Sequence, residues 1–197
     1  MIDLLTLENG APLLDGLLDF YPQAVHQPQH IYQALLEQLP WQSDTITVYG
    51  KQHVIPRLQC WMGDSGLSYT YSGKTLSTLA WHPLVQKLNE EINHQLGLSN
   101  NSVLCNLYRN GQDGMGWHSD DEPELGNAPV VVSLTLGAER DFALRRKGDS
   151  RMHSKIALPH GSVLVMKAGM QSRWQHSLPK RTGVSQPRIN LTFRKLV

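Results

Sequence analysis

The stretch PRINLTFR, residues 187–194, alternates polar and apolar side chains without a break. A period of two residues is typical of a β-strand that has one face in a core and the other face elsewhere. The apolar face of such a strand would consist of Ile189, Leu191 and Phe193. The opposite face would carry Arg188, Asn190, Thr192 and Arg194. The pattern therefore predicts a strand with one face in the hydrophobic core and the other face at a polar surface or in a functional site.

Similar short stretches fill the sequence between residue 100 and this strand. They are rich in Val, Ile, Leu, Thr and Phe, and Gly, Pro, Asn or Asp separates them. The strands that this pattern predicts are 102–109, 115–119, 130–137, 140–146, 153–158, 161–167, 172–177 and 188–195. About eight short strands in one block favour a β-sandwich or a jelly roll.

Helices are predicted only before residue 100. Apolar residues recur with helical spacing over 28–39, which ends at Pro40, and over 82–96, which ends at Gly97. Residues 45–72 alternate and contain turn signals, which predicts strands and hairpins. We therefore expect three parts within one structural unit. These are a loose N-terminal arm (1–27), helices with a hairpin region (28–100) and a β-core (101–197).

The composition excludes several classes of protein. A chain of 197 residues with 40% apolar and 18% charged side chains is expected to fold as one domain and not to be disordered. It contains no apolar run near the ~20 residues of a membrane span, and its acidic N-terminus does not resemble a signal peptide. Two cysteines, Cys60 and Cys105, cannot make a disulfide scaffold. A cytoplasmic protein with reduced thiols is expected.

The charge is distributed very unevenly along the chain. Residues 1–139 carry 5 basic and 15 acidic side chains, whereas residues 140–197 carry 13 basic and 2 acidic ones, and the net charge is only +1. Clustered lysines and arginines attract phosphates, so the C-terminal part is a candidate surface for a polyanion such as nucleic acid. An interleaved fold could instead mix the two charges.

The clearest chemical motif lies in the predicted strand 115–119 and just beyond it. His118 and Asp120 are two residues apart, so their side chains can point at one object. With a second histidine they would form a two-histidine-one-carboxylate triad, which holds non-haem Fe(II) and leaves coordination positions open. Candidates for the second histidine are His153, His160 and His176. The strand-like surroundings of His176 favour it. The alternative for His118 and Asp120 is a polar strand end at the surface.

Two arginines on one face of the last strand are a second signal. Arg188 and Arg194 would both need an anionic partner, and guanidinium groups match carboxylates bidentately. A dicarboxylate cosubstrate fits this requirement. Two solvent-facing arginines on an edge strand are the alternative.

Taken together, these motifs resemble the AlkB family of Fe(II)/2-oxoglutarate dioxygenases, and most of all its branch that repairs double-stranded DNA. The resemblance covers about residues 45–197. Its matching segments are Tyr49-Gly50-Lys51, Pro56-Arg57, residues 63–73 (GDSGLSYTYSG), Asn106-Leu107-Tyr108, residues 118–122 (HSDDE) and the block from residues 176–179 (HSLP) to the C-terminus, which includes Arg188 and Arg194. It implies an α+β, mainly β fold. The core would be a double-stranded β-helix (jelly roll), with N-terminal helices and a nucleotide-recognition hairpin region that serves as a lid.

The resemblance also implies roles for individual residues. The iron ligands would be His118, Asp120 and His176. The 2-oxoglutarate site would use Asn106, Tyr108, Arg188, Thr192 and Arg194. The substrate side would use Tyr49, Gly50, Lys51, Arg57, Tyr69, Thr70, Tyr71, Asp121 and Glu122, with Glu122 helping to select among lesions. Tyr49 stands where this branch often has Phe at a residue that enters the duplex, so the preference for duplex DNA is in doubt.

The implied reaction is oxidative demethylation of N-alkylated bases, of the N1-methyladenine and N3-methylcytosine type, in DNA. Fe(II), 2-oxoglutarate and O2 would be used, and formaldehyde and succinate released. The expected protein is a monomer that acts on duplex or single-stranded DNA, with RNA as a further candidate substrate. It would be found in the cytoplasm, at a bacterial nucleoid or in a nucleus. The alternatives are a 2-oxoglutarate dioxygenase for RNA, protein or a small molecule, and a non-catalytic jelly-roll binding module.

Overall fold

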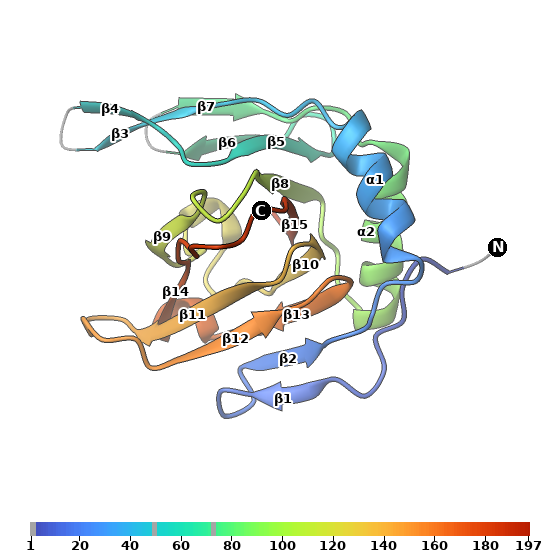
Figure 1. The fold of residues 1–197 in the computed structure, drawn as a ribbon. Helices are drawn as coiled ribbons and strands as arrows, with labels where there is room; N and C mark the ends of the chain where they lie inside the picture. The colour runs from blue at the N-terminus through green and yellow to red at the C-terminus, as the bar shows by residue number, and fades with distance from the viewer. Residues whose placement is uncertain (1–2, 49–50, 72–73) are drawn as a thin grey trace.

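The computed structural model describes residues 3–48, 51–71 and 74–197 (Figure 1). Within this range, the side chains of 46–48, 68–71 and 74–77 are not described. The helices are α1 (Pro28–Gln38), α2 (Pro83–Leu96) and α3 (Met170–Arg173), with a 3-10 turn η1 (Pro123–Leu125). The first seven strands are β1 (Ala11–Leu13), β2 (Leu18–Tyr21), β3 (Thr45–Val48), β4 (Lys51–Val54), β5 (Leu58–Gly63), β6 (Ser68–Tyr71) and β7 (Lys74–Ser77). The remaining strands are β8 (Ser102–Tyr108), β9 (Met115–His118), β10 (Val131–Gly137), β11 (Arg140–Arg146), β12 (Ser154–Leu158), β13 (Ser162–Met166), β14 (Trp174–Leu178) and β15 (Arg188–Arg194).

Two antiparallel sheets form the core. The large sheet has the order β1-β2-β13-β10-β15-β8-β5, and the small sheet has the order β12-β11-β14-β9. From β8 to β15 the chain passes back and forth between the two sheets, which is the double-stranded β-helix that the resemblance implied (Figure 1). The mainly β fold class and its jelly-roll core are confirmed.

The large sheet is apolar on the face that the helices cover. Ile31 and Leu35 of α1 and Leu88 of α2 pack there in one cluster with Leu191 and Phe193 of β15. Because side chains alternate along a strand, the opposite face of β15 carries its polar residues between the two sheets. The strand therefore divides the core from the site, as its sequence predicts.

The prediction of a loose N-terminal arm is wrong for much of that segment. β1 pairs with β2, and β2 pairs with β13, so the arm extends the large sheet. Leu5 and Leu18 are fully buried, and the Glu91 carboxylate accepts the backbone N–H of Leu5 at 3.1 Å. Strands of three and four residues are too short to show a period, and the partner of β2 lies about 140 residues away.

Two small hairpins, β3–β4 and β6–β7, stand apart from the core sheets (Figure 1). Both hairpins lie within the segment predicted to form the lid. The strand between them in the sequence, β5, instead pairs with β8 in the large sheet. The division of the chain near residue 100 stays a prediction.

The stretch 172–177 is only partly a strand. A one-turn helix, α3, occupies its start, and β14 begins at Trp174. Gly169 precedes α3 with a φ of 84°, a conformation that favours glycine and turns the chain into the helix. Four residues are too few for a helical period to stand out from an alternating one.

Candidate metal centre and its two pockets

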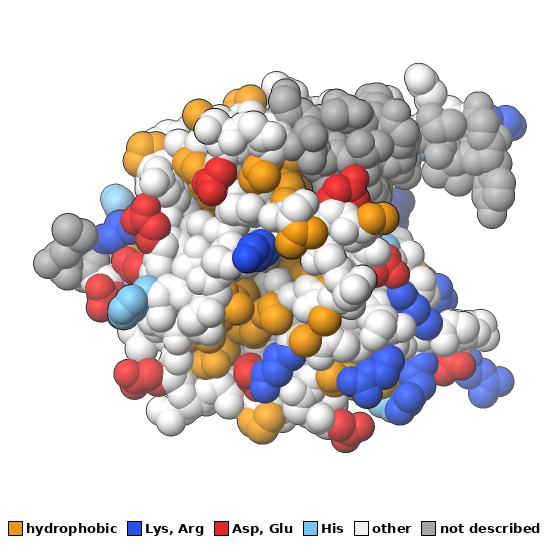
Figure 2. All heavy atoms as spheres, turned by 180° about the vertical axis from the view of Figure 1, so that it is seen from behind, with side chains coloured by type: hydrophobic (Ala, Val, Ile, Leu, Met, Phe, Trp, Pro, Cys, Tyr) orange, Lys and Arg blue, Asp and Glu red, His pale blue; other side chains and the backbone are white. Residues whose placement is uncertain are grey.

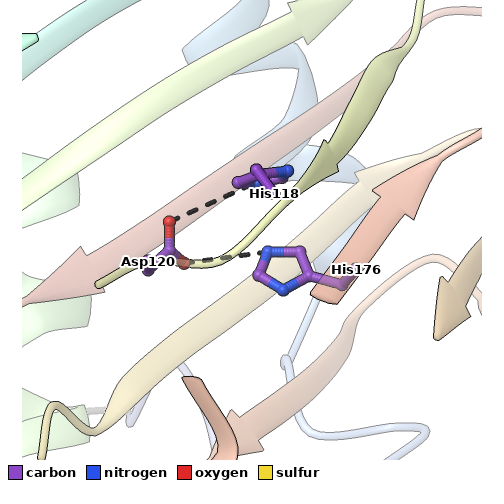
Figure 3. Close-up of side chains that lie close together, drawn as sticks. All are labelled: His118, Asp120 and His176. Carbon is purple, nitrogen blue, oxygen red and sulfur yellow. Dashed lines mark ion pairs between the residues drawn. The ribbon is translucent and has the colours of Figure 1, made fainter. Parts of the chain in front are cut away.

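Three side chains that the sequence singles out converge on two neighbouring strands, β9 and β14. His118 ends β9, Asp120 follows it, and His176 lies on β14 directly opposite His118 (Figure 3). One ligand atom from each of the three lies within 4.8 Å of the other two. Two imidazole nitrogens and a carboxylate oxygen at this spacing can hold one divalent transition metal and leave positions open for other ligands.

Each histidine is oriented by a specific contact. His118 Nδ1 lies 2.9 Å from the Gly116 carbonyl and donates to it, which leaves Nε2 as the free donor of a lone pair. The His176 ring stacks on Phe142 with 5.0 Å between centroids. Burial, together with the neighbouring His118, lowers the pKa of His176 to about 3. His176 is therefore neutral at physiological pH, the form that a metal requires.

Asp120 is held by an ion pair. Arg194 Nη2 donates to Asp120 Oδ1 at 2.7 Å, and the carboxylate is almost completely buried. Burial alone would raise the pKa of Asp120, but the charge of Arg194 and those of the histidines lower it below its ordinary value. The carboxylate is thus ionised and fixed in place before any metal arrives.

A pocket of about 450 Å³ lies between the sheets on one side of the triad. Arg188 is buried in its wall, where Nη2 donates to Thr135 Oγ1 at 2.8 Å and to Asn190 Oδ1 at 2.7 Å. Burial lowers the pKa of Arg188 to about 10, so it stays cationic at neutral pH. In the described part of the chain, the charges that act on it come from Tyr108 and Arg140, and none is a carboxylate. A buried cation without an anion favours an anionic ligand.

The remaining residues predicted for the cosubstrate line the same pocket. The Arg188 guanidinium lies over the Tyr108 ring, with 5.4 Å between its Cζ atom and the ring centroid. Asn106 and Thr192 are buried in the wall, and Arg194 lies beside the triad. The structure thus brings together all five of these residues.

A second pocket, of about 600 Å³, lies on the other side of the triad. It shares Met115, His118, Asp120 and Arg194 with the first pocket. Its wall includes Arg57, Gln59, Trp61, Leu104, Glu122 and Leu196. Because both pockets are lined by His118 and Asp120, a metal held by the triad would face two different molecules.

A family model described as the 2OG-Fe(II) oxygenase superfamily matches residues 13–194. The chain belongs to the 2OG-Fe(II) oxygenase superfamily. Members of this superfamily use Fe(II), 2-oxoglutarate and O2, so the cofactors expected from the sequence are confirmed. Within the superfamily, the resemblance to the AlkB family is confirmed as well.

Curated relatives support this placement within the 2OG-Fe(II) oxygenase superfamily. The chain is 40% identical over 179 residues to the human "Alpha-ketoglutarate-dependent dioxygenase alkB homolog 3", which is 86% of this chain and 62% of that protein. It is 42% identical over 160 residues to the human "DNA oxidative demethylase ALKBH2", which is 77% of this chain and 61% of that protein. The chain therefore spans about three fifths of the length of these relatives.

A solved structure of OsALKBH1 has the same fold, with a TM-score of 0.61 at 17% identity. The superposition covers 97% of this chain and 99% of that one. A 2OG-Fe(II) oxygenase family oxidoreductase from Burkholderia pseudomallei has a TM-score of 0.57 at 15% identity, with 91% and 85% covered. Both therefore support the fold alone.

Of the four predicted substrate residues whose side chains are described, Arg57 and Glu122 line the second pocket, whereas Asp121 and Lys51 line neither pocket. Asp121 points away and forms a 2.6 Å ion pair with Lys147, whereas Glu122 lines the second pocket. Arg57 is buried in that pocket, where its Nε donates to Asn106 Oδ1 at 3.0 Å. Lys51 is exposed on β4.

The other predicted substrate residues are described only in part or not at all. Tyr49 and Gly50 lie outside the described residues. Tyr69, Thr70 and Tyr71 form β6, but their side chains are not described.

Sequence reasoning missed part of the polar wall. Ser133 and Thr135 are buried on β10, opposite β15. Ser133 Oγ donates to Asn190 Oδ1, and Arg188 Nη2 donates both to that oxygen and to Thr135 Oγ1. A polar pair two residues apart in the otherwise apolar stretch VVSLTLG (131–137) was the available signal, since both side chains must share one face.

None of the helices in the described ranges is both long and apolar enough to cross a membrane.

Proposed function

We propose that this chain is an Fe(II)/2-oxoglutarate-dependent dioxygenase that removes N-alkyl groups from bases in DNA. The observation that carries the proposal is the pair of pockets that meet at one triad of candidate ligands. One pocket contains a buried cation and suits a dicarboxylate. The other is lined by Trp61, Leu104, Leu196 and Glu122 and suits a base. The name of one relative, "DNA oxidative demethylase ALKBH2", supports this choice of substrate.

The proposed iron ligands are His118, Asp120 and His176. Their donor atoms fit a facial triad, and the neutral His176 and ionised Asp120 are in the states that a metal needs. When bound, iron with O2 and 2-oxoglutarate supplies the oxidation of the N-methyl carbon. The N-methyl group leaves as formaldehyde, and 2-oxoglutarate becomes succinate and carbon dioxide.

Arg188 is the proposed partner of the distal carboxylate of 2-oxoglutarate. Its Nη2 is committed to Thr135 and Asn190, which orients the guanidinium, and its buried Nε has no hydrogen-bond partner among the described residues. A carboxylate at this position would satisfy both the charge and the open donor. Asn106, Tyr108 and Thr192 would complete the cosubstrate pocket with Arg194.

Glu122 is the proposed reader of the alkylated base. Its Oε2 atom is buried without a hydrogen-bond partner in the described part of the protein, and it lines the second pocket with Arg57 and Trp61. N1-methyladenine and N3-methylcytosine are cations, so a buried carboxylate acceptor favours them. A flipped base would reach this pocket beneath the β3–β4 and β6–β7 hairpins, where Tyr69 and Tyr71 are proposed to stack.

The hairpins carry the remaining proposed contacts to DNA. Tyr49, at the predicted tip between β3 and β4, would fill the gap that a flipped base leaves, with Gly50 and Lys51 beside it. Thr70 would lie on the substrate side with its two tyrosine neighbours. Asp121 would contribute at the edge of the site, where its ion pair with Lys147 now holds it.

Phosphate contacts are proposed for basic residues on the small sheet and in the loops that adjoin it. Figure 2 shows Lys and Arg side chains gathered on one side of the rear face, the side to which the β11–β12 hairpin extends. The candidates are Arg145, Arg146, Lys147, Arg151, Lys155, Lys180 and Arg181. Arg145 and Arg146 cover tryptophan rings, and Lys155 pairs with Asp141. Arg151 and Lys180 are exposed. Binding should therefore weaken steeply with salt.

The test is release of formaldehyde and succinate from the purified chain with Fe(II) and 2-oxoglutarate. Oligonucleotides with N1-methyladenine, N3-methylcytosine or ethenoadenine are compared in single-stranded DNA, duplex DNA and RNA. The proposal expects turnover on DNA and none with His118→Ala. Turnover on RNA only would mean that the substrate is RNA and not DNA. Consumption of 2-oxoglutarate that no nucleic acid stimulates would mean that the substrate is a protein or a small molecule. Absence of Fe(II) binding would favour a non-catalytic module.

This substrate would place the protein where DNA is, at a nucleoid or in a nucleus. A further comparison uses Tyr49→Ala. The wedge role expects a larger loss of activity on duplex than on single-stranded substrate, and equal losses on both contradict that role.

A further inference from the structure

The short segment that leaves β9 is held by two side-chain hydrogen bonds. The Asp120 backbone N–H donates to Gln171 Oε1 at 3.0 Å, and Ser119 Oγ donates to the Trp174 carbonyl at 2.8 Å. Both partners belong to the segment 171–174, which runs from α3 into β14 and leads directly to His176. The two bonds therefore join one candidate ligand, Asp120, to the segment that carries another.

Gln171 is built into this position. Its side chain is 1% exposed, and its Nε2 donates to Met166 Sδ at 3.4 Å, beneath α3. The Asp120 N–H can only donate, so the amide oxygen of Gln171 has to face it. A buried N–H needs an acceptor, and in the described structure Gln171 provides the one that Asp120 uses.

We propose that Gln171 is a positioning residue for the metal carboxylate. By fixing the backbone at Asp120 against the segment that leads to His176, Gln171 and Ser119 set the separation of two ligands that are 56 residues apart in the sequence. This inference rests on the proposed metal site and extends it. It assigns a function to α3, where the sequence predicted the start of a strand.

Gln171 holds the backbone of Asp120, whereas Arg194 holds its carboxylate. The ion pair fixes one carboxylate oxygen but leaves the main chain free to move, because an aspartate side chain has two rotatable bonds between its main chain and its carboxylate. With both ends held, the carboxylate has one orientation toward the triad. Partners that orient metal ligands in this way typically contribute 10–100-fold to metal affinity.

The test is a Co(II) titration of the metal-free protein, followed by the visible absorption of the bound ion and carried out without 2-oxoglutarate or DNA. Gln171→Met keeps the length of the side chain and removes the acceptor. We expect its dissociation constant for Co(II) to rise about 10–100-fold, with a changed absorption spectrum. Gln175→Met is the matched control, because Gln175 is one residue from His176 but accepts from Arg145 Nε, not from Asp120. It should bind Co(II) as the unchanged protein does.

Wild-type affinity and spectrum in Gln171→Met, whatever its stability, would overturn the inference and leave the metal site in place. No Co(II) binding by the unchanged protein would overturn the metal site and the inference with it. If Gln171→Met does not fold, Ser119→Ala carries the test. Loss of the bond to Trp174 should weaken Co(II) binding severalfold, and Ser119→Thr, which keeps a hydroxyl, should restore it. An unchanged Ser119→Ala protein would then refute the inference.

Discussion

Asp120 and Arg194 form a 2.7 Å ion pair, although they are 74 residues apart in the sequence. The Asp120 side chain is 4% exposed and that of Arg194 is 11% exposed, so solvent screens this pair only weakly. Removal of one partner from a buried pair typically costs about 3–5 kcal/mol, because the remaining charge is left without compensation.

Arg194→Met should therefore lower the free energy of unfolding by about 3 kcal/mol. It should also raise the pKa of Asp120 and weaken metal binding, most of all below neutral pH. Urea unfolding of the metal-free protein and Co(II) titrations at pH 7.5 and 6.0 measure the two effects. Arg173→Met, at an exposed arginine outside both pockets, is the control. Equal stability in the two variants would contradict this prediction.

Arg188→Met should act on the cosubstrate. A charged hydrogen bond contributes about 1.5–3 kcal/mol, so we expect the KM for 2-oxoglutarate to rise roughly 10–100-fold. Succinate release against 2-oxoglutarate concentration gives this value, with the exposed Arg151→Met as control. An unchanged KM would show that the distal carboxylate binds elsewhere.

The stability of the metal-free protein should fall with acid. Burial lowers the pKa of His176 to about 3 in the folded protein, whereas in the unfolded chain it is near its ordinary 6.5. Between these values only the unfolded chain binds the proton, so stability is lost as the pH falls from 6.5 toward 3. The loss from this residue at pH 5 is about 2 kcal/mol. Urea unfolding at pH 7.5 and 5.0 should show a smaller loss in His176→Gln, and equal losses would argue against a buried neutral ring.

Glu122→Gln should change the choice of lesion. The variant keeps an acceptor but loses the negative charge, so it should lose more activity on cationic N1-methyladenine than on neutral ethenoadenine, by about tenfold. Competition between the two lesions in one oligonucleotide mixture measures the ratio. Glu124→Gln, two residues away and outside both pockets, should leave the ratio unchanged. A proportional loss on both lesions would speak for a general role of Glu122.

Leu18→Ala tests the N-terminal strand. Leu18 is fully buried, so its truncation should cost about 3 kcal/mol in the free energy of unfolding, as in other well-packed cores. Leu79, which is 40% exposed, is the control, and its truncation should cost less than ~0.5 kcal/mol. Urea unfolding measures both. A similar small effect at the two positions would mean that β2 contributes little to the fold.

The sequence predicted the parts of the fold that have a period. The alternation in 187–194 identified both faces of β15, and the helical spacing over 82–96 identified α2 to within one residue. The triad and the two arginines could also be found, since the residue types themselves limit the chemistry. The strand and the helix depend only on neighbouring residues in the sequence, and the triad and the arginine pair each depend on a few residues of distinctive chemistry.

What the sequence did not reveal depends on contacts between distant segments. β2 is too short to have a period, and its place in the large sheet depends on pairing with the distant strand β13. The bond from Asp120 to Gln171 joins residues 51 apart, and nothing in either neighbourhood predicts the other. That Asp121 turns to Lys147 while Glu122 enters the pocket also depends on how β14 brings β11 and β9 into one sheet.

The pairing of β2 with β13 also has a consequence for synthesis of the protein. β2 ends at Tyr21, and its partner begins at Ser162, so about 140 residues are translated between them. At about 5–20 residues per second this takes roughly 7–28 s. During that interval β2 can pair with β1 but not with β13, and Leu18, which later becomes fully buried, lacks the β13 side of its native surroundings. The large sheet can therefore be completed only late in translation, and the early strands depend on remaining unaggregated until then.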